Sequence, residues 1–172
     1  EFMLRQQETI RRGGDYIHAQ GLEFYIWRRE LRIPVGFMKK YGEAWVDFAN
    51  PQVWELVRWN LNAFFEALVQ VDGLILTCTG EEKPGEWISA DGVGGALPLT
   101  DRFEKMFRAV QETCDACGKK VIFRNHGVAY PGVKLDGGEY MNAFLEAVRR
   151  VGPETVIMGK CVEEDFQATY PY

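Results

Sequence analysis

Hydrophobic residues along the chain fall into two kinds of segment. Four short runs are nearly all apolar or rich in aromatic and β-branched residues, which predicts strands. These runs are residues 22–27, 74–76, 121–123 and 156–158. In the intervening segments, and before the first run, apolar residues recur at helical spacing. These segments are residues 4–19, where the pair Gly13-Gly14 weakens the helical pattern, and residues 53–68, 103–114 and 140–148.

Residues that favour helix ends stand at the borders of these segments. Asn50 is a good N-cap, and Pro51 fits the first position of a helix. Thr100 is expected to cap the next helix, and Gly118 is expected to end it. Gly152, followed by proline, is expected to end the last helix.

The resulting order, (α)βαβαβαβ, predicts an α/β fold in which parallel strands are joined by right-handed crossovers. Four such units make half of an eight-stranded (β/α) barrel, which takes about 250 residues. We therefore expect residues 1–172 to form a single domain, a half-barrel of about four parallel strands with flanking helices. A small doubly wound sheet is the alternative. A half-barrel exposes two sheet edges and an apolar inner face, so we expect the chain to self-associate as a homodimer.

Composition narrows the classes of function. At 172 residues and 47% hydrophobic content the chain is large enough for one buried core. A net charge of −5 argues against nucleic acid as a partner. No apolar run is long enough to span a membrane, and no signal peptide is visible, so we expect a cytoplasmic protein. Residues 1–2, Glu-Phe, are encoded by the cloning site GAATTC and are expected to be cloning residues.

Cysteines and glycine motifs give no indication of a cofactor. Cys114 and Cys117 form a C-x-x-C, but no second pair of cysteines or histidines follows, so we expect plain reduced cysteines. No strand is followed by G-x-G-x-x-G, and G-x-x-x-x-G-K-[ST] is absent. We expect neither a metal nor an organic cofactor.

Ionisable residues follow all four predicted strands. In parallel α/β folds these positions meet at the end of the sheet where active sites form. Carboxylates on different strands, with cations between them, suit cleavage of a glycosidic bond. A ring of salt bridges that stabilises the loops is the alternative. The residues are Arg28, Arg29 and Glu30; Glu81 and Glu82; Arg124 and His126, with the polar Asn125 between them; and Lys160, Glu163, Glu164 and Asp165.

Three stretches carry a resemblance to a known family. They are Asp-Gly-Leu-Ile-Leu-Thr-Cys-Thr-Gly-Glu-Glu-Lys-Pro-Gly at 72–85, Val-Ile-Phe-Arg at 121–124 and Lys-Cys-Val-Glu-Glu-Asp-Phe-Gln at 160–167. In this order and spacing they resemble microbial α-glucuronidases, barrel glycoside hydrolases that remove glucuronic acid from xylan side chains. The resemblance runs from about residue 21 to residue 172 and implies that the four strands correspond to barrel strands three to six.

The resemblance implies a role for several residues. Glu81 falls on the family's general acid, and Asp165 falls on one of two candidate bases, which implies an inverting hydrolase. Arg124 and Lys160 fall on residues that bind the uronate carboxylate. The sequence departs from the family at Thr77, where the family has a second uronate-binding lysine. The family's other candidate base follows a later strand, which this chain lacks.

Two further residues are candidate carbohydrate contacts. His126 lies at a strand end, and Trp87, in the long segment after the second strand, either stacks on a sugar or packs the loop against the barrel. We expect this chain alone to be inactive, because half of the substrate site is absent. One alternative is a hexosaminidase-like barrel glycosidase in which Glu82 assists a substrate amide. The other is a non-catalytic, self-associating half-barrel domain.

Overall fold

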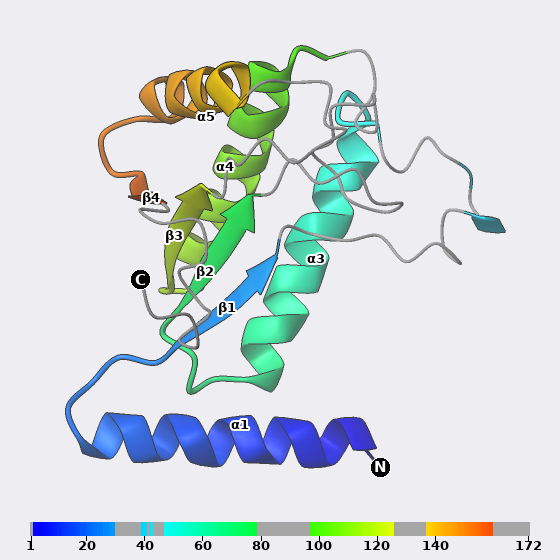
Figure 1. Cartoon of the computed structure of the whole chain (residues 1–172). Coiled ribbons are helices and arrows are strands. Elements are labelled where there is room, and N and C mark those ends of the chain that lie inside the picture. Colours follow the sequence, from blue (N-terminus) through cyan, green and yellow to red (C-terminus); the bar gives the residue numbers. More distant parts are fainter. Residues whose placement is uncertain are drawn as a thin grey trace, which may run out of the picture.

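The computed structural model describes residues 2–29, 39–40, 42, 47–78, 97–125 and 137–159. Helices and strands alternate along these residues (Figure 1). In chain order they are α1 (Phe2–Ala19), β1 (Tyr25–Arg29), α3 (Pro51–Ala67), β2 (Gly73–Cys78), α4 (Leu99–Ala116), β3 (Lys120–Asn125), α5 (Gly137–Val151) and β4 (Val156–Gly159). None of the helices in this part of the chain is long and apolar enough to cross a membrane.

The four strands form one parallel sheet in the order β1-β2-β3-β4. Each strand therefore lies beside its neighbour in sequence, and each consecutive pair is connected by a crossover. This confirms the predicted α/β class and the four parallel strands. The arrangement is the one that half of a (β/α) barrel would have.

Local sequence explains where α3 begins, and the structure corrects the expected start of α4. The Asn50 side chain accepts a hydrogen bond from the Gln52 amide at 3.0 Å, and Pro51 is the first residue of α3, as predicted. By contrast, α4 begins at Leu99 with Pro98 as its N-cap, so Thr100 lies inside the first turn and does not cap the helix. Extended backbone at Pro98 sets this boundary two residues earlier than a cap at Thr100 would.

The core lies between one face of the sheet and helices α3, α4 and α5. We call this the helix-facing side; it carries Leu74 and Leu76 of β2 and Val121 and Phe123 of β3, all buried. Its centre is aromatic: the ring centroids of Phe107 and Phe123 are 4.3 Å apart. Phe107 also contacts Phe103 and Phe144 at 5.6 and 5.1 Å. Apolar side chains from two helices and a strand therefore meet around one ring.

The opposite face of the sheet, which we call the inner face, carries the alternate residues of each strand. Cross-strand pairing aligns Trp27, Ile75, Ile122 and Val156 in one row across this face. Ile75 and Ile122 in the central strands are half-buried, whereas Trp27 is 47% exposed and Val156 is 52% exposed. This row of the inner face is therefore apolar and least covered at its two edges.

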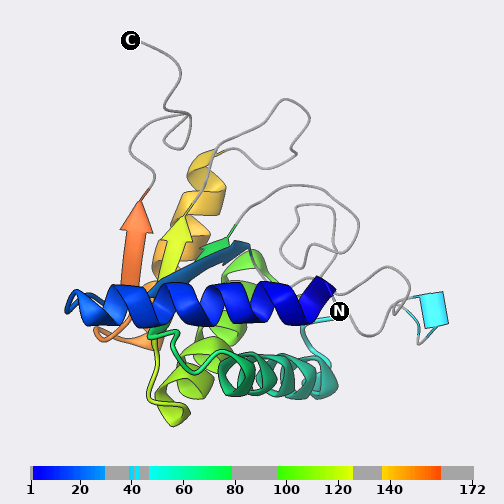
Figure 2. The same ribbon diagram turned by 90° about the horizontal axis from the view of Figure 1, so that it is seen from below.

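Helix α1 lies across the amino-terminal ends of the strands (Figures 1 and 2). The Arg11 guanidinium donates two hydrogen bonds, of 3.0 and 2.7 Å, to the carbonyl oxygen of Ala67 at the end of α3. The Asp72 carboxylate, just before β2, accepts hydrogen bonds from the His18 ring at 2.7 Å and from the Phe24 amide at 2.6 Å. Polar contacts thus connect α1 to the segments that enter β1 and β2.

The pair Gly13-Gly14 does not interrupt α1. One of the two, Gly14, allows another segment of the chain to approach the helix closely. A Cβ atom on Gly14 would lie 2.5 Å from the Cβ atom of Gln70, whereas a Cβ atom on Gly13 would meet nothing within 4 Å. Gly14 therefore allows the helix to contact the turn before β2. The sequence pattern showed the low helical propensity of the pair and did not show this contact.

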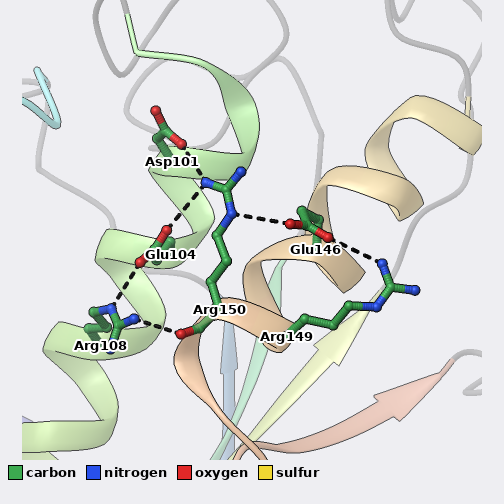
Figure 3. A network of polar contacts seen from close by, with 6 residues as sticks. All are labelled: Asp101, Glu104, Arg108, Glu146, Arg149 and Arg150. Atoms are coloured by element: carbon green, nitrogen blue, oxygen red, sulfur yellow. Dashed lines mark hydrogen bonds and ion pairs between the residues drawn. The ribbon is translucent and has the colours of Figure 1, made fainter.

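Ion pairs join the outer surfaces of α4 and α5 (Figure 3). The Arg150 guanidinium lies 2.9 Å from Asp101, 3.4 Å from Glu104 and 3.3 Å from Glu146. Arg108 pairs with Glu104 at 3.0 Å and also donates a hydrogen bond to the carbonyl oxygen of Arg150. All these side chains are partly exposed, so the network orients two packed helices and adds little to stability.

Candidate functional site

The carboxyl ends of the strands place polar residues on both faces of the sheet. The last inner-face row pairs Arg29 of β1 with Thr77 of β2, Arg124 of β3 and Met158 of β4. Ligands of parallel α/β sheets bind at this end. Arg124 and Thr77 therefore lie where a ligand of the complete fold would be expected.

Arg124 is the most unusual of these residues. It is 1% exposed and is the largest fully buried side chain in the described part of the protein. Its neighbours in sequence face the helices, so the alternation of the strand places Arg124 on the inner face. A buried guanidinium is costly unless anionic or strongly polar groups surround it. Arginine in such a position suits the binding of a carboxylate or a phosphate.

Thr77 lies beside Arg124 and links it to the edge of the sheet. Thr77 is 1% exposed, and the indole Nε1 of Trp27 donates a hydrogen bond to its Oγ1 at 2.6 Å. Three strands, β1, β2 and β3, thus contribute neighbouring side chains to this end of the inner face. Neither Trp27 nor Thr77 was predicted as a site residue. Both could have been found from the alternation of residues along a strand, which places them on the same face of the sheet as Arg124.

Two residues expected at the common end of the strands face the helices. The Arg28 guanidinium lies 5.6 Å from the centre of the Phe64 ring of α3, and burial lowers the pKa of this guanidinium. The side-chain amide of Asn125 contacts the Met141 sulfur of α5 at 2.9 Å. The expectation that these polar residues converge is therefore wrong for Arg28 and Asn125. Both lie inside strands that extend further than the apolar runs suggested, and their parity directs them outward.

The structure places one of the six predicted site residues. Arg124 is described above. The others lie outside the described residues, as do Glu82 and the acidic residues at 163 and 164. These five are Glu81, Asp165, Lys160, His126 and Trp87. Their assigned roles stay predictions.

The cysteines of the described residues are consistent with structural roles. Cys78, Cys114 and Cys117 are free thiols. Burial, together with the nearby Asp115 carboxylate, raises the pKa of Cys114 to about 12, so this thiol is not a nucleophile at neutral pH. The Cys117 sulfur instead contacts the Asn62 side chain on α3 at 3.3 Å. Within the described ranges no group of three or more histidine, cysteine or acidic residues is arranged to bind a metal ion.

Comparison with known proteins gives no relative. No family model, no curated protein and no solved structure matches this chain. Inference about function therefore rests on the fold, on the residues at the strand ends and on the motifs of the sequence.

Proposed function

We propose that this chain is half of a (β/α)-barrel glycoside hydrolase similar to the α-glucuronidases, and that the complete barrel hydrolyses a glycosidic bond to a uronic acid. The four sequential parallel strands support the barrel part of this proposal. The chemistry rests on one observation: Arg124, fully buried on the inner face at the carboxyl end of β3. The guanidinium offers paired donors that match a carboxylate, which is the group that distinguishes a uronic acid from a neutral sugar.

The proposed reaction needs two carboxyl groups. Glu81 gives its proton to the leaving oxygen, and Asp165 activates a water molecule on the opposite side of the sugar. For an inverting hydrolase these groups lie roughly 6.5–9.5 Å apart. Arg124 and Lys160 bind the substrate carboxylate, and His126 and Trp87 contact the sugar. This chemistry requires no metal or organic cofactor.

Thr77 favours one alternative within the same class of enzyme. Where α-glucuronidases have a lysine, this chain has a threonine whose hydroxyl accepts a hydrogen bond from Trp27. A site with fewer cations suits a sugar without a carboxylate, such as an N-acetylhexosamine, with Glu82 assisting the substrate amide. The choice between the two substrates therefore depends on whether Arg124 recognises a carboxylate.

A binding experiment on the 172-residue chain tests this point, because a subsite can bind a sugar without turnover. Saturation-transfer NMR compares methyl glucuronide with methyl glucoside, which differ in the carboxylate. We expect the glucuronide to bind at least about tenfold more tightly, a difference equal to one charge-assisted hydrogen bond. The variant Arg124→Met is expected to abolish this preference.

Arg58→Met is the matched control. Arg58 lies on α3 and pairs with Glu112 on the outer surface at 3.1 Å, so this variant also removes one arginine but leaves the inner face unchanged. Thermal unfolding followed by circular dichroism shows whether each variant is folded. Equal binding of the two sugars by the wild-type chain contradicts the uronate proposal. Binding of neither sugar supports the non-catalytic half-barrel. Aryl glycosides are expected to show no turnover with this chain alone.

A further inference from the structure

Strand β4 is an apolar strand that is unusually exposed. Its four residues, Val-Ile-Met-Gly, are all exposed, whereas every residue of β2 is buried or half-buried. Val156, Ile157 and Met158 are 52%, 43% and 38% exposed, and they alternate between the two faces of the sheet. Edge strands of monomeric proteins usually carry charges, prolines or bulges that prevent pairing. β4 carries no charged residue and no proline.

The other edge of the sheet has a matching feature. In the described chain β1 pairs with β2 alone, and Trp27 on its inner face is 47% exposed. Among the described residues nine large hydrophobic side chains are exposed; four of them belong to these two edge strands, and none belongs to the central strands β2 and β3. Exposed apolar surface is therefore concentrated at the two edges, where pairing with a further strand would cover it.

We propose that β4 pairs in parallel with β1 of a second copy, and that two copies close an eight-stranded barrel about a twofold axis parallel to the strands. All four strands run in the same direction, and β1 and β4 are at opposite edges. A twofold rotation about this axis keeps every strand parallel and brings each β4 beside the partner's β1. A second copy thus satisfies both edges at once, and four strands from each copy give the eight of a closed barrel.

The side chains of the inner face fit this closure. Trp27, Ile75, Ile122 and Val156 form one row across the sheet, and two copies would continue this row around the barrel. Barrel interiors are filled by bulky apolar side chains of this kind. Pairing of β4 with the partner's β1 also places exposed Val156 and Met158 on the same face as exposed Trp27. The inference rests on the fold and is independent of the proposed hydrolase activity.

Sedimentation equilibrium of the full chain, over a series from about 1 to about 100 μM, tests the proposal. The expected species has twice the chain mass of 19.7 kDa. Val156→Lys adds a charge to the exposed edge strand and is expected to weaken the dimer roughly tenfold or more. Met158→Lys, on the same face, is a second variant with the same expectation. Trp59→Lys is the control, because Trp59 is 66% exposed but lies on α3, outside the proposed interface.

Each possible outcome decides for or against the closed dimer. A dimer that both β4 variants weaken and Trp59→Lys leaves intact supports it. A monomer at every concentration overturns it. Masses that grow beyond the dimer indicate open head-to-tail pairing and overturn the closed barrel. A dimer that neither β4 variant weakens overturns the proposal, and weakening by Trp59→Lys instead places the interface on the helices. Far-ultraviolet circular dichroism shows whether each variant is folded. If neither β4 variant folds, hydrogen exchange of the wild-type chain is measured instead, and the proposal then predicts that β4 loses protection on dilution.

Discussion

The two faces of the same sheet differ in how they are covered. On the helix-facing side, Leu76, Phe123 and the helix residue Phe107 are each 0% exposed. On the inner face, Trp27 and Val156 of the two edge strands are about half exposed, whereas Thr77 and Arg124 of the central strands are buried. Helices α3, α4 and α5 cover the helix-facing side, whereas in a complete barrel the strands of the other half would cover the edges of the inner face. Stability of the isolated chain therefore comes from the helix-facing side, and association is expected to use the inner face and its edges.

The contrast between the two faces is tested most directly by removing one large side chain from each face. Phe107→Ala opens a cavity among Phe103, Phe123 and Phe144 and is expected to cost about 3–5 kcal/mol of unfolding free energy. Trp27→Ala removes a half-exposed side chain and its hydrogen bond to Thr77, and is expected to cost about 1–2 kcal/mol in the monomer. Urea unfolding at low protein concentration measures both. Equal costs would contradict the contrast between the faces.

A smaller effect is expected where the inner face is closely packed. A Cβ atom on Gly73 would lie 2.5 Å from the Tyr25 ring and 2.6 Å from the carbonyl oxygen of Lys120. The backbone oxygen cannot rotate away, so Gly73→Ala is expected to destabilise the chain by about 1–3 kcal/mol. Gly13→Ala is the control, since its Cβ atom meets nothing and a helical alanine is expected to add about 0.5–1 kcal/mol. Urea midpoints of the two variants should move in opposite directions.

The contact between α1 and the entry to the sheet gives a pH-dependent effect. Burial by itself raises the pKa of Asp72, but hydrogen bonds from the Phe24 amide and the His18 ring outweigh burial and hold this pKa below its ordinary value of 3.8. Such a carboxylate stabilises the fold above pH 3.8, and this contribution is lost as the pH falls through the lower, folded-state pKa. Asp72→Asn is expected to cost about 1 kcal/mol at neutral pH and to reduce the loss of stability in acid. An unchanged acid profile would exclude Asp72 as its source.

The smallest effect is expected on the outer surface, at the Arg150 network. Hydrogen bonds from Arg150 to Asp101, Glu146 and Glu104 raise the pKa of the guanidinium, but all these groups are solvated. Arg150→Ala is expected to lower the melting temperature only slightly, and the difference from wild type should disappear in about 1 M salt, where charges are screened within about 3 Å. A difference that persists in high salt would mean that packing between α4 and α5, rather than charge, had been lost.

Much of the fold could be predicted from the sequence, because apolar residues recur at a different spacing in helices than in strands. The apolar positions of α4, from Phe103 to Cys114, are all buried as predicted. The ends of β1 and β3 could not be predicted in this way. Both strands continue through polar residues, Arg28 and Arg29 in β1 and Arg124 and Asn125 in β3, which an apolar run does not include. Contacts between distant segments, such as Gly14 against Gln70, leave no periodic signal either.

The candidate site was predictable only as a position along the chain. Charged residues after each strand indicated the end of the sheet at which a site would form. They did not indicate which side chains face the barrel interior, because that depends on strand parity counted from the true strand start. Arg124 faces the inner side and Arg28 faces the helices, although both follow an apolar run. Thr77 belongs to this end of the inner face because it pairs with Arg124 across the sheet, and it accepts a hydrogen bond from Trp27.

Hydrogen exchange followed by mass spectrometry tests the central claim, that the chain is a half-barrel whose edges are completed by a second copy. Strands β2 and β4 are compared in concentrated and in dilute protein. The account predicts that β2 is protected at both concentrations, whereas β4 is protected only in concentrated protein, where its edge is paired. Protection of β4 that does not change with concentration, or its absence at every concentration, would contradict the account.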